Sequence, residues 1–352
     1  MKENILFLKI FLLASVLLSC NQSKKNRDLP NFIIIYADDL GYGDLSCYGA
    51  SDIKTTNLDL MAKNGIMFTD FYSPAASCSP SRAGLLTGKY PPRTGINSVF
   101  FPESHTGLDP SEITLAEILK AQNYTTGIIG KWHLGHFKKF LPLAQGFDHY
   151  FGIPYSNDMK SVVYMRDNEV ESYNVDQSLI TKTYTDEAKK FIVESKEHPF
   201  FLFLSHNMPH VPIYASKEFQ GKSNRGLYGD VIEELDWSVG EILLTLKSLN
   251  ILENSLIIFT SDNGPWLSMK KIGGSAGILR EGKSHTFEGG MRVPMIAMWP
   301  AKIDKGVISN SVSSQLDFLP TIKKILNMDL NGIEDGKDLF NEFFYNSNNQ
   351  DQ

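Results

Sequence analysis

The chain has 352 residues, of which 42% are hydrophobic and 21% charged, and its formal net charge is −6. With 22 Phe, 14 Tyr and 4 Trp it is too rich in aromatic residues to be disordered, and 3 Cys are too few for a disulfide scaffold. The acidic balance argues against nucleic acid as a partner, because a phosphate-binding surface normally needs a basic excess.

Residues 1–19 have the pattern of an export signal. Two lysines precede an apolar run over residues 10–18, which is too short to span a bilayer as a helix. The run ends in LLSC at positions 17–20, which resembles a bacterial lipoprotein box with Cys20 as the lipidated residue. Residues 20–30 would then be a polar tether. We therefore expect a lipoprotein of the bacterial cell envelope, periplasmic or at the surface, attached to the membrane only by its lipid. A plain secretory signal with an incidental cysteine is the alternative.

Four apolar runs have the composition of buried parallel strands, and segments with helical periodicity lie between them. This alternation predicts an α/β fold with a parallel sheet covered by helices on both faces. We assign it to one catalytic domain over residues 31–340, followed by a polar tail over residues 341–352. The predicted strands are 32–36, 125–129, 200–204 and 256–260, and the predicted helices are 57–64, 115–122, 184–195 and 231–249.

Each predicted strand is followed by residues that bind metals or transfer protons. Open α/β sheets bind ligands just beyond the carboxyl ends of their strands, so these residues are candidates for one site. They are Asp38 and Asp39 after the first strand, Lys131 and His133 after the second, His206 and His210 after the third, and Asp262 and Asn263 after the fourth.

The acidic pairs after the first and fourth strands supply three carboxylates and one amide oxygen. Such an all-oxygen set suits a hard cation such as Ca²⁺ or Mg²⁺. Taken alone, each pair is more often a turn or a helix cap. Because carboxylates crowded at one sheet edge repel each other unless a cation is present, their joint occurrence favours a metal site.

The segment CSPSR at positions 78–82 introduces a predicted helix over residues 82–86. A cysteine near a helix N-terminus and beside Arg82 lies in a positive field, which favours thiolate character for Cys78. Two other interpretations stay open. Cys78 is either an ordinary buried free cysteine or the partner of Cys47 in a disulfide.

The same segment resembles the signature of the formylglycine-dependent (type I) sulfatases, in which a dedicated maturation enzyme oxidises the cysteine to an aldehyde. The resemblance runs from about residue 31 to residue 339 and is closest to the branch of arylsulfatase A and N-acetylgalactosamine-6-sulfatase. Further blocks that resemble this family, in the same order, are GYGDL at 41–45, GKWHLG at 130–135 and EGGMRVP at 288–294.

This resemblance implies an alkaline-phosphatase-like fold, with a mostly parallel sheet sandwiched by helices, and an enzyme that hydrolyses sulfate esters. Cys78 would mature to formylglycine, whose hydrate contacts a cation, usually Ca²⁺ and alternatively Mg²⁺. One hydroxyl of the hydrate attacks sulfur to form a covalent sulfo-enzyme, and deprotonation of the second hydroxyl releases sulfate. The implied metal ligands are Asp38, Asp39, Cys78 after maturation, Asp262 and Asn263.

The resemblance also assigns roles around the cation. Arg82 would stabilise the hydrate, and His133 would be the base of the second step. His206 is a candidate helper of His210, and Arg292 is expected to support its own loop rather than touch substrate. The implied contacts to the sulfate oxygens and the leaving group are Lys131, Ser156, His210 and Lys283.

Members of the family usually continue past blocks like DFLPT at 317–321 and DGKDL at 335–339 into a small antiparallel subdomain. This sequence ends at Gln352, so we expect that subdomain to be largely missing.

The leading hypothesis is hydrolysis of sulfate esters, with a sulfated carbohydrate or an aryl sulfate as substrate. We expect the sulfated carbohydrate to be a sugar or a glycan fragment. A phosphodiesterase or phosphonate hydrolase on the same fold is one alternative, because some of those enzymes also mature a cysteine. The other alternative is a truncated, non-catalytic glycan-binding lipoprotein that keeps the pocket without turnover.

Overall fold

The structure is a computed structural model that describes residues 29–330 and 334–345. The predicted export signal with Cys20 lies outside the described residues, as do nearly all of the tether and most of the predicted polar tail. The domain boundaries proposed from the sequence therefore stay predictions.

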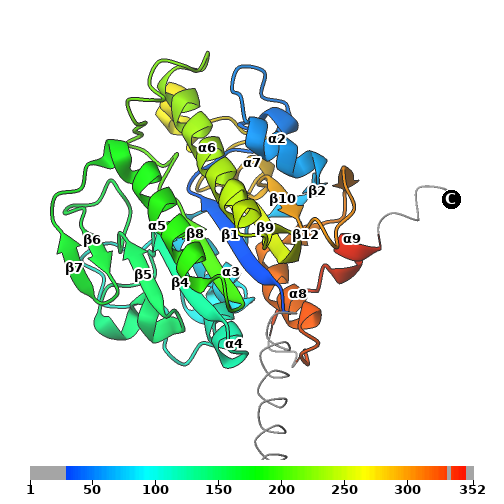
Figure 1. Cartoon of the computed structure of the whole chain (residues 1–352). Coiled ribbons are helices and arrows are strands. Elements are labelled where there is room, and N and C mark those ends of the chain that lie inside the picture. The colour runs from blue at the N-terminus through cyan, green and yellow to red at the C-terminus, as the bar shows by residue number, and fades with distance from the viewer. Residues whose placement is uncertain (1–28, 331–333, 346–352) are drawn as a thin grey trace, which may run out of the picture.

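The four predicted strands form the centre of a ten-stranded sheet with the order β11-β2-β10-β9-β1-β8-β4-β5-β6-β7 (Figure 1). They lie side by side and parallel in the order β9-β1-β8-β4, so their carboxyl ends meet at one edge of the sheet. This part of the prediction is confirmed. The observed bounds are Asn31–Ala37 for β1, Thr125–Gly130 for β4, Phe200–Ser205 for β8 and Ser255–Ser261 for β9.

Shorter strands extend this sheet on both sides and were not predicted. Strand β10 runs antiparallel to β9, and β6 runs antiparallel to both β5 and β7, so the sheet is mixed but mostly parallel at its centre. The added strands are β2 (Ile66–Phe68), β5 (His149–Gly152), β6 (Tyr164–Arg166), β7 (Glu169–Ser172), β10 (Met295–Met298) and β11 (Val307–Ser309). A separate small sheet pairs β3 (Phe71–Tyr72) with β12 (Ser313–Ser314).

Helices cover both faces of the sheet, as predicted (Figure 1). One face packs against α2 (Thr56–Lys63), α5 (Ile180–Ser195) and α6 (Leu227–Ser248). The other packs against α3 (Cys78–Thr87), α4 (Leu115–Ala121) and α8 (Phe318–Ile325). Two short helices, α7 (Glu288–Met291) and α9 (Phe340–Phe344), lie in the C-terminal third.

The helix predicted over residues 82–86 begins four residues earlier, at Cys78. Ser77 before it has an extended backbone, and Pro80 occupies the third helical position. Proline is tolerated in the first turn of a helix because the backbone N–H groups there have no intrahelical partner. Cys78 is therefore the first residue of α3 rather than part of a loop leading to it.

The core lies on both sides of the central strands. In β1, the alternate residues Phe32, Ile34 and Tyr36 pack toward α3, α4 and α8. Ile33 and Ile35 pack toward α2, α5 and α6. Burying one such side chain contributes about 1.5–3 kcal/mol, so two buried faces make the central strands a rigid support for whatever follows their carboxyl ends.

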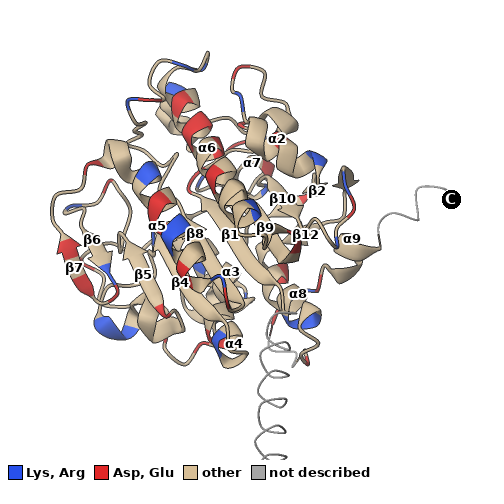
Figure 2. Ribbon diagram, viewed as in Figure 1, with Lys and Arg blue, Asp and Glu red and all other residues tan. Residues whose placement is uncertain are grey.

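Acidic residues mark α6 in Figure 2, and acidic and basic residues are interspersed over the other elements in that view.

Within residues 29–330 and 334–345, no helix combines the length and apolar character that crossing a bilayer requires.

Candidate active site

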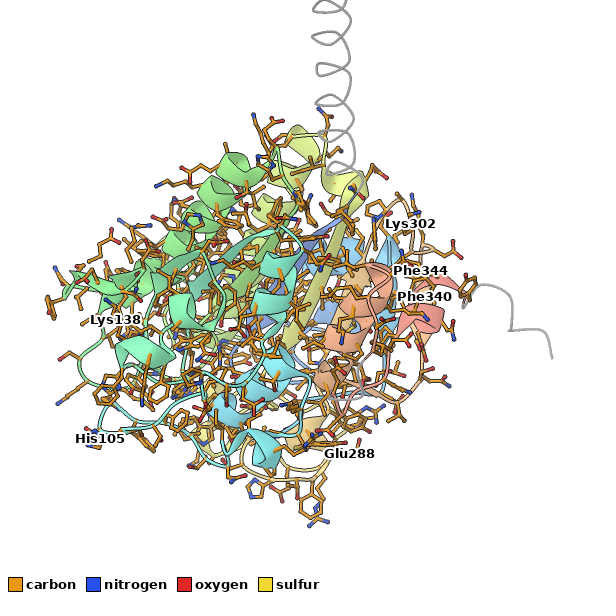
Figure 3. The ribbon with its side chains drawn as sticks, turned by 90° about the horizontal axis from the view of Figure 1, so that it is seen from below. His105, Lys138, Glu288, Lys302, Phe340 and Phe344 are labelled. Atoms are coloured by element: carbon orange, nitrogen blue, oxygen red, sulfur yellow. The ribbon has the colours of Figure 1, made fainter. Side chains whose placement is uncertain are left out.

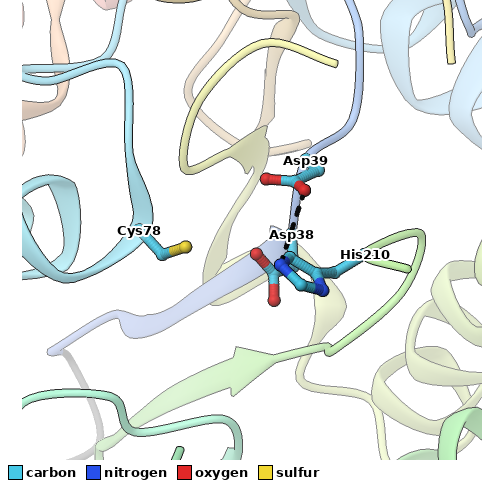
Figure 4. A group of neighbouring side chains, drawn as sticks. All are labelled: Asp38, Asp39, Cys78 and His210. Carbon is cyan, nitrogen blue, oxygen red and sulfur yellow. Dashed lines mark ion pairs between the residues drawn. The ribbon is translucent and has the colours of Figure 1, made fainter. Parts of the chain in front are cut away.

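The ends of the central strands bring the candidate residues together at one edge of the sheet. Figure 4 shows Asp38 and Asp39 beyond β1, with Cys78 and His210 beside them. All four side chains are buried, and each offers one ligand atom within 4.8 Å of the others. Three separate segments of the chain thus form one compact cluster.

The two adjacent aspartates face different partners. Asp38 accepts a hydrogen bond on Oδ2 from the Lys131 ammonium at 2.5 Å. Asp39 has a left-handed backbone, with φ 67°, and accepts on Oδ2 from the Lys283 ammonium at 2.8 Å. The Asn263 amide donates to the other oxygen of Asp39 at 2.8 Å. Each carboxylate therefore lies against the ammonium group of a different lysine.

Arg82 reaches this cluster from the first turns of α3 and is fully buried. Its guanidinium donates to Asp262 Oδ2 at 2.9 Å and to the Ser205 hydroxyl at 2.6 Å, and it lies 3.8 Å from Asp38 Oδ1. Asp262 in turn accepts the backbone N–H of Asp39 on Oδ1 at 3.0 Å. These bonds lock the ends of β1, β8 and β9 to α3.

The oxygens of this cluster fit a hard cation. Among the described residues, Asp38 Oδ1 and Asn263 Oδ1 are buried without a hydrogen-bond donor, which is costly for a polar atom. Burial and the charge of Asp38 raise the pKa of Asp262. Burial also opposes the charge of Asp38, but Lys131, His210 and Arg82 outweigh it and lower the pKa of that carboxyl. Crowded carboxylates with unused lone pairs suit Ca²⁺ or Mg²⁺.

The Cys78 thiol lies at the start of α3 with 1% of the residue exposed. Burial raises its pKa to about 11, although Lys131 and Lys283 pull in the opposite direction. The expected thiolate character is therefore wrong, because the helix terminus and nearby cations do not offset the lost solvation. Cys47 and Cys78 are both free, which excludes the disulfide between them.

Three polar groups line the space beside the aspartates. The Ser156 hydroxyl lies 3.4 Å from the Lys131 ammonium and 3.4 Å from His210 Nδ1. His210 Nδ1 donates to the Val211 carbonyl at 2.6 Å, which leaves Nε2 facing Asp39 at 3.7 Å.

His133 is buried and has a left-handed backbone with φ 62°. Its Nε2 donates to the Phe100 carbonyl at 2.9 Å, so Nδ1 is the atom with a free lone pair, and it is buried without a partner. Burial first, then the charges of Lys131 and Arg82, hold the pKa of His133 well below its ordinary value. The ring is therefore neutral, and Nδ1 is its unprotonated nitrogen.

His206 lies outside the cluster. Its Nε2 lies 3.2 Å from the Ser238 hydroxyl of α6, its ring packs 6.3 Å from that of Tyr184, and burial lowers its pKa to about 3. It is a core histidine, and the suggestion that it helps His210 is wrong. Arg292 donates to the Thr69 carbonyl at 2.6 Å and pairs with Asp70 at 2.9 Å, so its contacts hold its own loop.

Trp266 is a site residue that the sequence analysis missed. The Lys283 ammonium lies 4.4 Å from the centre of its ring, and the His210 ring lies 5.5 Å away. A cation over an indole face is attracted by the ring quadrupole. Trp266 therefore contacts both Lys283 and His210. Its position three residues after Asn263 was the signal that could have found it.

Asp44 was also missed, although it lies in the GYGDL block. Its Oδ2 accepts from the Tyr228 hydroxyl at 2.7 Å, from Gly41 N–H at 2.9 Å and from Ser275 N–H at 3.1 Å. Burial raises the pKa of Asp44 to about 6. These bonds tie the loop after β1 to α6 and to the loop that leads to Lys283.

Comparisons with known proteins identify the family of this chain. The Sulfatase family matches residues 30–328. Human arylsulfatase A is 39% identical over 339 residues, which cover 88% of this chain and 67% of that protein. N-acetylgalactosamine-6-sulfatase of Rattus norvegicus is 43% identical over 319 residues, which cover 83% of this chain and 61% of that protein.

A solved structure of a Bacteroides thetaiotaomicron protein, from work on its metabolism of multiple glycosaminoglycans, shares the fold. Its TM-score is 0.84 at 33% identity, over 89% of this chain and 81% of that one. The chain therefore belongs to the sulfatase family, whose named relatives are sulfuric ester hydrolases, and its fold is the alkaline-phosphatase-like fold. It spans about two thirds or less of the length of the two mammalian relatives, 67% and 61%.

Proposed function

We propose that this protein hydrolyses sulfate esters and that Cys78, after maturation to formylglycine, is its reactive residue. The observation that carries the proposal is the position of the Cys78 thiol, which is buried within 4.8 Å of ligand atoms of Asp38, Asp39 and His210. A thiol whose pKa is raised to about 11 is a poor nucleophile as it stands, which is consistent with a residue that acts only after modification.

The proposed metal ligands are the four oxygen-bearing side chains together with Cys78 after maturation. A bound divalent cation would lower the pKa of a neighbouring hydroxyl and help neutralise charge that develops on the sulfuryl group. Three aspartates of the cluster pair with three fixed cations, Arg82, Lys131 and Lys283. Adding a divalent cation would leave the site net positive, which suits an anionic sulfate ester. The oxygen ligands are Asp38, Asp39, Asp262 and Asn263.

Four side chains, which we call the sulfate cradle, would bind the sulfate oxygens and orient the ester: Lys131, Ser156, His210 and Lys283. Lys131 and Ser156 lie within 3.4 Å of each other, and Ser156 lies equally close to His210, so these donors converge on one space. Donors held in place before the reaction stabilise the charge that spreads over the equatorial oxygens in the transition state. Arg82 is already held by Asp262 and Ser205, and it would stabilise the matured Cys78 side chain.

His133 would accept the proton whose removal lets sulfate leave. Its Nε2 is committed to the Phe100 carbonyl, so the proton would go to Nδ1. The low pKa of His133 keeps that nitrogen unprotonated near neutral pH. Matured Cys78 would supply two hydroxyls on one carbon, one for attack at sulfur and one for this release step.

We propose a sulfated carbohydrate as the substrate, with aryl sulfates as simpler alternatives. The proposal is supported by the name N-acetylgalactosamine-6-sulfatase of one relative and by the glycosaminoglycan context of the solved neighbour. The protein would need a formylglycine-generating maturation enzyme. We also propose that Cys20 carries a lipid that anchors the protein at the bacterial cell envelope.

The test is to produce the protein together with a formylglycine-generating enzyme and to measure turnover of 4-nitrophenyl sulfate. Mass spectrometry should show the peptide containing Cys78 lighter by the difference between a thiol and an aldehyde side chain. Cys78→Ala should abolish turnover without changing the far-UV circular dichroism spectrum. Cys47→Ala, the matched control at the other free cysteine of the part that the structure describes, should stay active. Full activity in Cys78→Ala would refute the proposal.

A further inference from the structure

A cavity of about 270 Å³ lies directly beside the sulfate cradle. Ser156 belongs to both, because its hydroxyl faces Lys131 and His210 while the residue also lines the cavity. Tyr155 also lines the cavity. Its ring packs edge-on against the His133 ring, with 6.0 Å between the ring centres. The cavity therefore adjoins the groups proposed to hold and release sulfate through two of its lining residues, Ser156 and Tyr155.

The lining of this cavity is mostly apolar. Polar atoms come from Ser156, Ser161, Lys160 and the pair His136 and Tyr155, and no carboxylate is among the described residues that line it. Such a lining accepts an uncharged or anionic ring that has an apolar face and a few hydroxyls. Apolar contacts come from Pro102, Ile153, Met159, Val163, Met165 and Val170.

Aromatic rings lead from the buried site to the surface along this wall. His136 Nδ1 hydrogen-bonds the Tyr155 hydroxyl, and the His136 ring lies 4.5 Å from the ring of Phe137. Phe137 stacks on His105 at 5.8 Å, and Figure 3 shows His105 and Lys138 on the same side of the molecule. Ring faces of this kind pack against the C–H face of a pyranose, whose hydroxyls then point to the polar groups around it.

We propose that this cavity is the subsite for the alcohol part of the ester and that it holds one pyranose ring of a sulfated sugar against Tyr155 and His136. The inference rests on the proposed sulfatase function and deepens it. Drug-sized ligands occupy sites of roughly 300–1,000 Å³. A cavity of about 270 Å³ has room for a single ring, so the enzyme acts on a monosaccharide or on the terminal sugar of a chain.

Binding is measured by calorimetry with Ca²⁺ present, in the Cys78→Ser chain, so that turnover plays no part. The probes are galactose 6-sulfate, N-acetylgalactosamine 6-sulfate, phenyl sulfate and inorganic sulfate. Val170 lines the cavity and is 40% exposed, so Val170→Trp should fill the cavity without disturbing the core. The matched control is Val193→Trp on α5, where Val193 is 46% exposed and does not line this cavity.

At least one sugar sulfate should bind, and Val170→Trp should weaken its binding by at least about tenfold, a loss of about 1.4 kcal/mol. Inorganic sulfate should bind the parent chain and Val170→Trp with dissociation constants within about twofold of each other. Tyr155→Phe keeps the ring but removes the bond to His136, and it should weaken sugar binding by about three- to tenfold. Val193→Trp should bind every probe as the parent chain does.

An equal loss for inorganic sulfate, no loss at all, or no sugar sulfate bound would overturn the proposal. Tighter binding of phenyl sulfate than of both sugar sulfates would also overturn it, because the cavity would then be an aryl site. The unmutated chain separates the two proposals. Turnover of 4-nitrophenyl sulfate without sugar binding would leave hydrolysis standing and overturn the subsite. Sugar binding lost in Val170→Trp, without any turnover by the unmutated chain, would support the subsite and contradict the proposed activity.

Discussion

His206 illustrates at the scale of one residue why a histidine beside a sheet edge need not be catalytic. It follows β8 directly, as a site residue would, but its side chain turns toward Ser238 of α6. Burial lowers its pKa to about 3, so the native protein holds this ring neutral while the unfolded chain protonates it near pH 6.5. The unfolded state then binds one more proton, and the stability that depends on neutral His206 is lost as the pH falls below about 6.5.

We predict that His206→Gln reduces this acid sensitivity. Between about pH 7.5 and about pH 5 the unmutated chain should lose about 2 kcal/mol more unfolding free energy than His206→Gln, at about 1.4 kcal/mol per pH unit below pH 6.5. Urea unfolding at both pH values measures the difference. Exposed His149 on β5 provides the control His149→Gln, which should follow the unmutated chain. Loss of hydrolysis in His206→Gln at neutral pH would show instead that His206 serves the site.

The candidate residues that adjoin long strands were predictable, and those that depend on tertiary contacts were not. Asp38 and Asp262 follow five-residue apolar runs, so their placement at one edge follows from the parallel order of the strands. Trp266 was missed because a lone tryptophan usually belongs to the core. Tyr155 and His136 meet only after the loops following β4 and β5 have folded together, and no sequence period marks that contact.

At the scale of elements, length decided which strands could be predicted. Strands β1, β4, β8 and β9 have six or seven residues, and burial on both faces makes them rich in apolar, β-branched or aromatic residues. Strands such as β11, with three residues, have no period to detect and form through pairing with partners far away in the chain. The start of α3 was misplaced by four residues, because the helix begins at Cys78 and its first turn accommodates Pro80.

The position of Lys131 depends on how closely the end of β4 approaches the end of β8. Gly130 has φ 115°, and a Cβ atom there would lie 1.8 Å from the Ser205 carbonyl oxygen at the end of β8. We predict that Gly130→Ala forces the two strand ends apart, displaces Lys131 and abolishes hydrolysis. Gly49 also has a left-handed backbone, with φ 102°, but a Cβ there meets nothing within 4 Å.

Gly49→Ala is therefore the control. It introduces the same kind of backbone strain, but its Cβ atom meets no other atom. Urea unfolding should show Gly130→Ala at least about 2 kcal/mol less stable than Gly49→Ala, because overpacking adds to strain of about 1–2 kcal/mol. Equal losses of unfolding free energy in the two variants would mean that the strand ends can separate at no cost in stability.

At the scale of the whole molecule, the proposed cation joins segments that are distant in the chain. Asp39 and Asp262 are bonded across 223 positions, and both belong to the ligand set proposed above. A cation that binds only the folded protein stabilises it by about 2.7 kcal/mol at a concentration 100 times its dissociation constant. We therefore predict that a chelator lowers the melting temperature and abolishes hydrolysis, and that adding Ca²⁺ or Mg²⁺ restores both.

The dependence of the melting temperature on the cation should be lost in Asp38→Asn. This substitution keeps the side-chain shape but removes one charge of the ligand set. Thermal unfolding of each chain with chelator and then with excess Ca²⁺ isolates the shift due to the cation from any loss of intrinsic stability. Asp186→Asn is the control, because Asp186 pairs with Lys182 on the surface of α5 and is exposed. If Ca²⁺ shifted the melting temperature of Asp38→Asn and Asp186→Asn equally, Asp38 would not be a ligand of the cation. Because Asp38 also pairs with Lys131, the melting temperature of Asp38→Asn in chelator alone reports how much of the fold depends on that buried ion pair.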